Sequence, residues 1–480
     1  SQIERIEVTR SGGTVRYGNG AVGGVVNIIT KNRPTNMDMY VAGGSYATQD
    51  IRFNYANSEH DVLAVKTNMS YYKTDGYRDN GGLEKKDFLI DLESVFSDEL
   101  LMGLTAKLHQ DDFGLPGPVS KENYEGSADQ RKSTTDPKDG GDSNENLFRW
   151  KMIYTPTENQ TADASLYYRE HYSDTVIKFA PAKPKKDQLL SIEDRRVGGN
   201  LIYSRLDSIY GMTSKSSIGT DFFVTDYEQY RNGRTVADQS QQKMGNIDGQ
   251  ALFTDWGLDS KHWSFSAGWR EDRSQLSQNE ENFKHLCDYK NVIIPPFPFP
   301  IPVQTNCRNE WVNEVDRDEV WKNSAAEAGV VYRFNDVFNG FIGFAKSFRN
   351  PNLDELLLAE GDLLPQTGKH WDMGLRFDNQ RAKWEFTVFS IVIEDEILYG
   401  MDPATSLAIN RNSDELTRRT GAETDFSYGF MDNRLRLNAN VGYVDAHFDE
   451  SGAFVPLVPR VTSTVGLIWN PDKSLSYSLS

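Results

Sequence analysis

Side chains that could carry out catalysis are few and scattered in this sequence. It contains no Gly-x-Ser-x-Gly nucleophile motif, no phosphate-binding loop and no His-Glu-x-x-His zinc motif. Gly18-Asn19-Gly20 has part of the glycine spacing of a dinucleotide-binding motif, but it does not open a helix in a strand–helix–strand unit. No pair of histidines has metal-binding spacing; the seven are His60, His109, His171, His262, His285, His370 and His447. The sequence therefore predicts no enzyme, no cofactor and no metal site.

The two cysteines, Cys287 and Cys307, have a spacing that predicts a covalent bond. They flank a proline-rich segment, residues 292–302, that has no regular pattern. Two cysteines placed around such a segment are typical of a disulfide that closes a loop. On the chain-entropy account, closing a loop of this length stabilises the fold by about 3 kcal/mol. A disulfide also implies an oxidising compartment; the alternative is two unpaired thiols.

Five side chains in expected loop segments are candidates for contact with a ligand. Asp111 and Asp112 precede a Phe-Gly-Leu-Pro-Gly-Pro turn, where their carboxylates would either attract a cationic ligand or solvate the loop. Tyr124 and Phe179 offer aromatic faces to an aromatic ligand. Arg349 stands directly before an Asn-Pro pair, where a strand is expected to end and a loop to begin.

Composition limits the class of protein. Of the 480 residues, 38% are hydrophobic and 12% are aromatic, and no stretch approaches the ~18 apolar residues that a membrane-spanning helix needs. A membrane β-barrel remains compatible, because lipid-facing and lumen-facing residues alternate along its strands. The formal net charge of −18 disfavours binding to nucleic acids, whose phosphate backbone requires a basic surface. The acidity suits solvated loops or the attraction of cations.

The candidate side chains must be positioned by strands. From about residue 38 onward, apolar and polar residues alternate with period two, most clearly over residues 434–443. Short turns alternate with long polar inserts, which we expect at about residues 113–143, 275–320 and 350–367. A soluble β-sandwich does not require connections that alternate between short and long, whereas a membrane barrel has short turns on one side and long loops on the other.

The alternation gives a count of about 19 strands. Residues 475–480 alternate and then stop in mid-strand. Because an open sheet edge in lipid would leave backbone groups unpaired, the native sheet must close. We therefore expect about three further strands after this chain; a closed barrel of 19 strands is the alternative.

The first 31 residues carry a resemblance to a known family. Two β-type runs, IERIEV and VVNIIT, flank a segment dense in glycine, which is needed where the backbone takes positive φ or packs very closely. The segment resembles the end of the plug domain of TonB-dependent outer-membrane receptors, although Ser11-Gly12 stands where the family usually has Gly-Pro. The matching motif residues are Arg5, Arg10, Tyr17, Gly18, Gly20, Gly23 and Gly24.

The resemblance implies an all-β architecture. Residues 1–35 would be the C-terminal part of an N-terminal plug domain, and residues 36–480 a transmembrane antiparallel β-barrel with long extracellular loops. Receptors of this family have 22 strands, so the chain would lack the last strands and most of the plug. The resemblance also implies a latch in which Arg10 of the plug meets Asp372 and Glu423 on the barrel wall; three unrelated lumen charges are the alternative.

The resemblance further implies a function. Such a receptor captures a scarce ligand, here expected to be a ferric siderophore, and imports it across the outer membrane of a Gram-negative bacterium. The TonB–ExbB–ExbD energy complex would act through the plug region upstream of Ser1, and outer-membrane lipid and lipopolysaccharide would surround a monomeric barrel. Cobalamin, haem or an oligosaccharide are alternative ligands, and a passive porin or surface adhesin is an alternative class.

Overall fold

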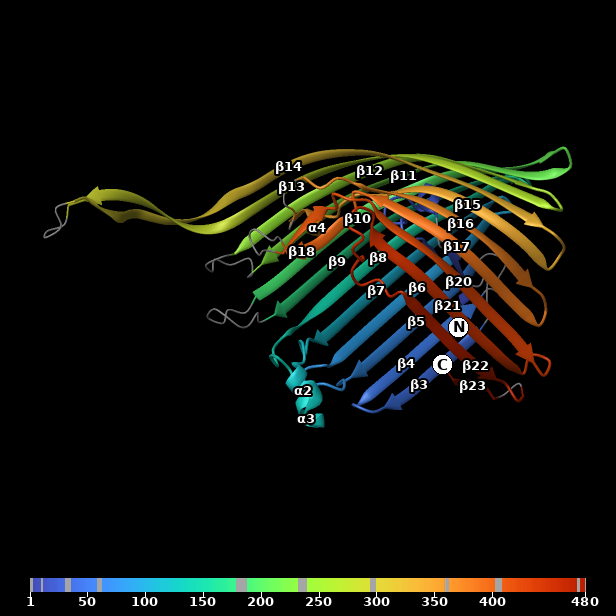
Figure 1. Cartoon of the computed structure of the whole chain (residues 1–480), viewed down its shortest axis with the longest axis horizontal. Helices are drawn as coiled ribbons and strands as arrows, with labels where there is room; N and C mark the ends of the chain where they lie inside the picture. The colour runs from blue at the N-terminus through green and yellow to red at the C-terminus, as the bar shows by residue number, and fades with distance from the viewer. Residues whose placement is uncertain are drawn as a thin grey trace.

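The fold is almost entirely β-structure. The computed structural model describes residues 3–9, 12–30, 36–57, 63–177, 188–231, 240–293, 299–357, 359, 362–401, 408–472 and 475–479. Within these residues, 19 strands form one antiparallel sheet that closes into a barrel in chain order (Figure 1). The predicted count is confirmed, and the sheet closes with β23 beside β3. A total of 22 strands in a longer protein stays a prediction.

The barrel strands lengthen toward the middle of the chain. The first ten are β3 (Asn36–Gly44), β4 (Thr48–Asn57), β5 (Leu63–Thr74), β6 (Leu83–Ser97), β7 (Leu100–Gly114), β8 (Gly140–Thr157), β9 (Gln160–Ile177), β10 (Gln188–Ile209), β11 (Met212–Arg231) and β12 (Gln241–Asp259). The remaining nine are β13 (Trp263–Val292), β14 (Ile301–Arg333), β15 (Phe338–Arg349), β16 (Gln366–Asp378), β17 (Ala382–Glu394), β20 (Thr417–Phe430), β21 (Leu435–Phe448), β22 (Val461–Trp469) and β23 (Tyr477–Leu479).

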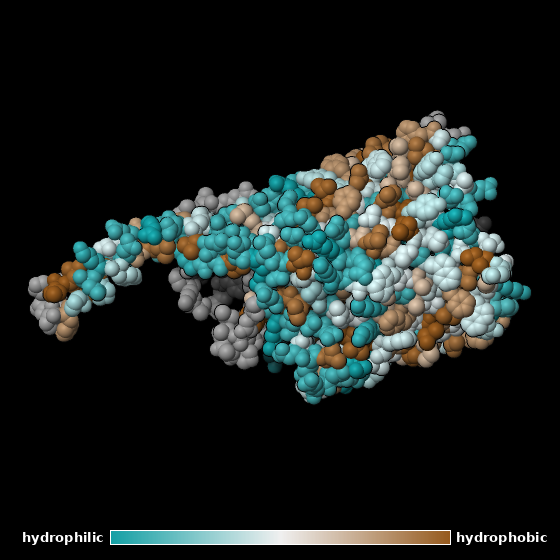
Figure 2. Space-filling model, turned by 90° about the horizontal axis from the view of Figure 1, so that it is seen from above, coloured by the Kyte–Doolittle hydropathy of each residue, from teal (hydrophilic) through white to brown (hydrophobic). Residues whose placement is uncertain are grey.

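The predicted alternation places apolar side chains on the outside of the barrel. On β16, Trp371 and Met373 are 54% and 56% exposed, while His370, the residue before Trp371, is 1% exposed. Successive side chains of a strand point to opposite faces, so the exposed set faces outward and the buried set faces the lumen. Figure 2 shows many apolar side chains on the broad part of the outer surface, whereas the narrow projecting end is largely hydrophilic.

The insert expected at residues 275–320 is instead regular structure, and this prediction was wrong. β13 and β14 pair from Trp263 opposite Tyr332 as far as Val292 opposite Ile301. The polar residues of this region are spaced along two strands, and a two-stranded ladder exposes both faces to water, so no apolar alternation marks it.

β12 pairs with β13 only up to Asn282, and β13 and β14 project beyond the barrel (Figure 1). We call residues 283–292 and 301–311 the ribbon.

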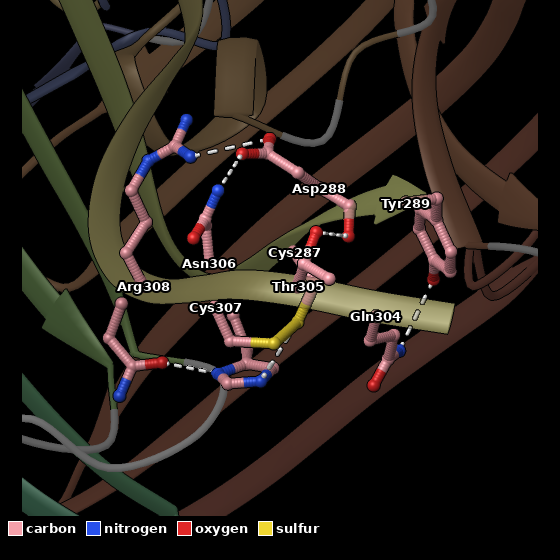
Figure 3. The surroundings of a disulfide bond; sticks show 10 residues. Cys287, Asp288, Tyr289, Gln304, Thr305, Asn306, Cys307 and Arg308 are labelled. Carbon is pink, nitrogen blue, oxygen red and sulfur yellow. Dashed lines mark hydrogen bonds and ion pairs between the residues drawn. A yellow bond between two sulfur atoms is a disulfide. The ribbon is translucent and has the colours of Figure 1, made fainter. Parts of the chain in front are cut away.

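The predicted disulfide lies in the ribbon and is confirmed. Cys287 and Cys307 are joined across the two strands (Figure 3). Around the bridge, Arg308 pairs with Asp288 at 3.7 Å, and the rings of Phe283 and Trp311 meet edge to face with centroids 5.4 Å apart. The bridge therefore joins the two strands of the ribbon, which pair only with each other among the described residues.

Three connections at the long-loop end have structure of their own. The connection after β7 contains α2 (Lys121–Glu125) and α3 (Ala128–Lys132); the one after β15 contains α4 (Leu353–Leu357); the one after β17 contains the hairpin of β18 (Ile397–Met401) and β19 (Ala408–Asn412). None of the helices in the described part of the chain has the length and apolar character needed to cross a membrane.

The N-terminal segment, residues 3–9 and 12–30, forms a small unit apart from the barrel sheet. β1 (Ile3–Thr9) and β2 (Val25–Thr30) pair antiparallel, as the two β-type runs predicted. Between them lies a one-turn helix, α1 (Thr14–Tyr17). Gly12, Gly13, Gly18, Gly20 and Gly24 all have positive φ, which explains the density of glycine in this stretch.

Replacement of both cysteines by serine should loosen the ribbon without opening the barrel. The change removes a constraint worth about 3 kcal/mol on the chain-entropy account, and the β13–β14 ladder with the side-chain contacts across it then holds the ribbon. We expect faster amide hydrogen exchange in residues 283–311 and unchanged exchange in β20 and β21. Equal exchange in the ribbon of both proteins would contradict this assignment.

Candidate functional site

The N-terminal segment lies inside the barrel, against one side of the wall. α1 contacts β12, β13, β14 and β15. Val15 of α1 is 1% exposed and belongs to a buried apolar cluster with Phe253 and Phe348 of the wall. The segment therefore occupies lumen space that would otherwise be open to water.

A carboxylate of the wall accepts a hydrogen bond from the first turn of α1. The backbone N–H of Gly13 donates to Oε2 of Glu327 on β14 at 3.1 Å. Gly13 has a φ of 91°, which a residue with a side chain adopts only at a cost. The carboxylate satisfies one of the N–H groups that a helix start leaves unpaired.

Arg16 of α1 is held by an ion pair and an aromatic ring. Its Nη1 lies 3.3 Å from Oδ2 of Asp255 on β12, and both side chains are about one-third exposed, at 39% and 34%. The guanidinium also lies over the ring of Phe253, 5.6 Å from its centroid. Water reaches this pair, so it contributes no more than about 1 kcal/mol.

Arg270 of β13 is a buried cation of the wall. It is 4% exposed, and it donates from Nη1 to Asp221 at 2.6 Å and from Nη2 to Asp272 at 3.1 Å. Nη1 also donates to the carbonyl oxygen of Val15 at 3.4 Å. Its guanidinium lies 5.7 Å from the ring centroid of Phe253, so the wall and the N-terminal segment each place an arginine against the same ring.

Gly18 and Asn19, directly after α1, also lie against the wall and the loop after β15. A Cβ at Gly18 would come within 2.7 Å of Nη2 of Arg270, so only glycine fits there without a shift. The side-chain oxygen of Asn19 accepts the backbone N–H of Asn350 at 2.8 Å. Asn350 in turn donates to Oγ of Ser274 on β13 at 3.2 Å. The segment is thereby tied to the start of the loop that contains α4.

A cavity of about 500 Å³ opens between the N-terminal segment and the wall, and we call it the inner cavity. Its lining includes Arg16, Tyr17 and Asn19 from the segment and Arg196 and Arg270 from the wall. The rest of the lining includes the rings of Tyr167, Phe222, Phe223 and Tyr227 and the carboxylates of Asp194, Asp221 and Asp272. Three cations, three carboxylates and several aromatic faces therefore meet in one concave site of the size that small-molecule ligands occupy.

Arg196 of β10 differs from the other two arginines of the inner cavity. It stacks on Phe223, with the guanidinium carbon 4.0 Å from the ring centroid. Its Nε is buried and has no hydrogen-bond partner, and none of the ion pairs found in the described residues includes it. Arg16 and Arg270 are already paired with carboxylates, so Arg196 is the cation best placed to accept an anionic group from a ligand.

The loop after β15 folds inward and covers part of the inner cavity. Leu353 and Leu356 of α4 pack in a buried apolar cluster with Tyr227, Leu276 and Trp321 of the wall. Arg349, one of the predicted ligand contacts, instead donates to Glu355 of the same loop at 2.9 Å and to Gln366 at 3.2 Å. Its role in the structure is to hold α4 against the barrel mouth.

A second cavity, of about 690 Å³, lies between β1 and β2 and the wall strands β15, β16, β17 and β20. Asp372 and Glu423 of the predicted latch both line it, together with Thr9. Arg10, the third member, lies outside the described residues, so the latch stays a prediction. The structure brings its two carboxylates to one cavity beside the residue that precedes Arg10.

The other predicted motif residues do not form one site. Arg5 is half-exposed and pairs with Glu4 and Glu7 on its own strand. Tyr17 lines the inner cavity, and Gly18 contacts Arg270. A Cβ added at Gly20 or at Gly23 would meet no atom within 4 Å, and Gly23 and Gly24 line the second cavity.

The predicted loop contacts lie apart from the inner cavity. Asp111 accepts from Ser143 at 2.6 Å and pairs with His109 at 3.3 Å, while Asp112 stands in a separate hollow near Gly114. Tyr124 is 69% exposed on α2. Phe179 lies outside the described residues.

The wall residues that hold the N-terminal segment carried little signal in the sequence. Glu327, Asp255 and Arg270 contact the N-terminal segment from positions more than two hundred residues away. No local spacing could pair them. A weaker signal existed, because most of the alternate residues of β13 from Arg270 to Glu280 are polar or charged, which marks a lumen face.

Comparisons with known proteins place the chain in a family. The sequence profile described as TonB dependent receptor-like, beta-barrel, matches residues 99–479. The chain is 43% identical over 68 residues to the ferrienterobactin receptor of Escherichia coli K12, and 66% identical over 83 residues to the ferric enterobactin receptor PirA of Pseudomonas aeruginosa. These matches cover 14% and 15% of this chain but only 8% and 11% of the relatives' own length.

Solved structures share the fold at low sequence identity. The ferric citrate transporter FecA in its unliganded form has a TM-score of 0.77 and 18% identity, over 97% of this chain and 68% of that one. The closed form of the ferric-catecholate import receptor Fiu from E. coli K12 has a TM-score of 0.78 and 15% identity, over 99% and 75%. At such identities the likeness establishes the barrel fold.

Alanine at Gly18 should release the N-terminal segment more than alanine at Gly20 or Gly23. Gly18 and Gly20 both have positive φ, which costs a side chain about 1–2 kcal/mol, but only at Gly18 would the new Cβ collide with Arg270. Trypsin cleavage after Arg16 measures the release. We expect rates in the order Gly18→Ala, Gly20→Ala, Gly23→Ala, with the last close to the unchanged protein; equal rates at 18 and 20 would refute the contact.

Proposed function

The chain belongs to the TonB-dependent receptor-like β-barrel family, and from that premise we propose that it is an outer-membrane transporter that binds and imports a ferric siderophore. The apolar outer face of the barrel supports a place in the outer membrane of a Gram-negative bacterium, among lipid and lipopolysaccharide. The family and the fold are those of receptors and transporters, and the proposal includes no covalent chemistry.

Arg196 in the inner cavity is the observation that carries the choice of ligand. Arg196 is half-buried, its Nε is buried without a hydrogen-bond partner, and no described carboxylate pairs with it, which favours a ligand that brings negative charge of its own. The neighbouring rings of Phe223, Tyr167 and Tyr227 suit a ligand with aromatic groups. An anionic iron chelate built on aromatic rings meets both requirements, and the names of the relatives, ferric enterobactin and ferric-catecholate receptors, support the same class.

We assign residues 1–35 to the plug domain and residues 36–480 to the barrel. The position of α1 inside the lumen supports this division. Transport then requires that the N-terminal segment shift away from the wall, and the TonB–ExbB–ExbD complex is proposed to supply the work through the plug. A monomer suffices, because one barrel contains both the cavity and the path.

Two alternatives are less well supported. A passive porin needs an open lumen, whereas here the N-terminal segment occupies it. A haem receptor needs an accessible iron ligand, and His370 on β16 is 1% exposed with Nε2 bonded to Ser347 at 2.7 Å. A neutral oligosaccharide lacks the negative charge that would match Arg196, and cobalamin offers one phosphate but no phenolic rings; both remain outcomes of the test below.

Growth on defined iron sources tests the proposed function. A strain lacking this gene, and lacking its other siderophore receptors, should fail to grow on one or more ferric catecholates as sole iron source. The gene supplied on a plasmid should restore growth, and only when TonB is present. Unchanged growth on every ferric chelate would exclude a siderophore as the ligand, and rescue without TonB would exclude active transport.

Replacement of Arg196 by alanine should weaken binding of the ferric chelate. Loss of a charged hydrogen bond costs about 1.5–3 kcal/mol, which corresponds to roughly a 10- to 100-fold rise in Kd. Arg205 on the same strand is a matched control, because it pairs with Asp207 and is half-exposed, away from the cavity. Quenching of protein fluorescence by the chelate measures both variants. An Arg196→Ala protein that binds as tightly as Arg205→Ala would place the ligand elsewhere.

A further inference from the structure

Three metal-ligating side chains converge on the ribbon, away from the inner cavity. The ligand atoms of His285, Cys287 and Cys307 lie within 4.8 Å of one another. His285 and Cys287 are two positions apart on β13, so their side chains share a face, and Cys307 reaches the same face from β14. Histidine and cysteine are the ligands that zinc prefers in proteins.

The imidazole of His285 is held in the tautomer that a metal ligand needs. Its Nδ1 lies 2.6 Å from the side-chain carbonyl oxygen of Asn309. A carbonyl oxygen only accepts, so Nδ1 carries the hydrogen and donates it. The lone pair is therefore on Nε2, which points at Sγ of Cys287 from 3.4 Å. A second partner that fixes the tautomer and the ring in this way is a regular feature of metal-binding histidines.

The disulfide does not require the orientation of the His285 ring. A disulfide sulfur has no hydrogen to donate, so the contact between Nε2 and Sγ is not a hydrogen bond in the oxidised protein. No donor from the described part of the chain reaches Nε2. The oriented lone pair thus has no function in holding the bridge, which the ribbon ladder and the sulfur–sulfur bond already secure.

We propose that reduction of this disulfide creates a Zn²⁺ site formed by His285, Cys287 and Cys307. Two equivalents of a low-molecular-weight thiol reduce the bridge, giving two protein thiols and one small-molecule disulfide. Zn²⁺ then displaces one proton from each thiol and binds two thiolates and Nε2, with water in the fourth tetrahedral position. The two released protons balance the charge, and no electron is transferred to the metal.

The site is suited to zinc rather than to a hard cation. Thiolate and imidazole ligands select Zn²⁺ over Mg²⁺ and Ca²⁺, which require oxygen ligands. All three residues stand on a two-stranded ribbon that has no further sheet neighbours in the described ranges, so the sulfurs can separate to accommodate the ion without disturbing the barrel. The exposure of His285 and Cys307 leaves a path for entry.

The test uses the purified full chain in detergent, reduced with a water-soluble phosphine and titrated with Co²⁺ as a spectroscopic probe for Zn²⁺. Reduced protein should give thiolate-to-cobalt charge-transfer absorption and the visible bands of a tetrahedral site, both abolished by added Zn²⁺. The oxidised protein and the Cys287→Ser/Cys307→Ser variant should give neither. Absence of these bands from the reduced protein, or their presence in the double serine variant, would overturn the proposal.

Single variants distinguish a metal site that includes His285 from metal binding by the two neighbouring thiols alone. His285→Ala should lower the affinity for Co²⁺ by at least about tenfold, and Asn309→Ala, which removes only the partner of Nδ1, by about 10- to 100-fold. Gln304→Ala is the matched control, because Gln304 bonds to Tyr289 on the same ribbon and touches none of the three ligands. If Asn309→Ala and His285→Ala bind as Gln304→Ala does, the proposal is wrong. Uptake of ferric chelates is a separate measurement, so this result is independent of the proposed transport function.

Discussion

The structure depends on one constraint, which is that every strand of the barrel wall must find a hydrogen-bonded neighbour on both sides. In lipid an unpaired backbone N–H or carbonyl costs several kcal/mol, so a sheet there is stable only when it closes. The 19 strands that form the barrel sheet in the described residues meet this condition, with β23 joining β3. Closure has a consequence for the interior, because a sheet of this many strands encloses more space than its own side chains can fill.

That interior is filled by charged and aromatic groups that must satisfy one another. Arg270 with Asp221 and Asp272 forms a buried cluster in which each charge has a partner. Such a cluster adds little net stability compared with an apolar core, but removing one member leaves the others unpaired at a cost of about 3–5 kcal/mol. The cluster therefore fixes the geometry of the wall, and the backbone of α1 is placed by donation from Arg270 to the carbonyl of Val15.

Local patterns predicted the barrel, whereas the inner cavity depends on contacts between distant parts of the chain. The alternation over residues 434–443 and the short turns each need no more than ten residues to be recognised, and the strand count followed. The ribbon was missed because its strands have no apolar face to alternate with a polar one. The pairing of Gly13 with Glu327 spans 314 positions, so no local spacing could reveal it. The resemblance named Asp372 and Glu423, which do line a cavity, yet the contacts of the described segment run through other residues of the wall.

The strengths of these contacts bear on how the N-terminal segment can move. Arg16 pairs with Asp255 where water reaches both side chains, which makes the ion pair worth no more than about 1 kcal/mol. The bonds from Gly13 to Glu327 and from Asn350 to Asn19 add about 0.5–3 kcal/mol each. By contrast, the carboxylates that hold Arg270 belong to the wall itself. A pull on the described segment would therefore break these polar contacts, the donation from Arg270 to Val15 and the apolar packing of Val15, while Arg270 keeps its carboxylate partners and the wall keeps its shape.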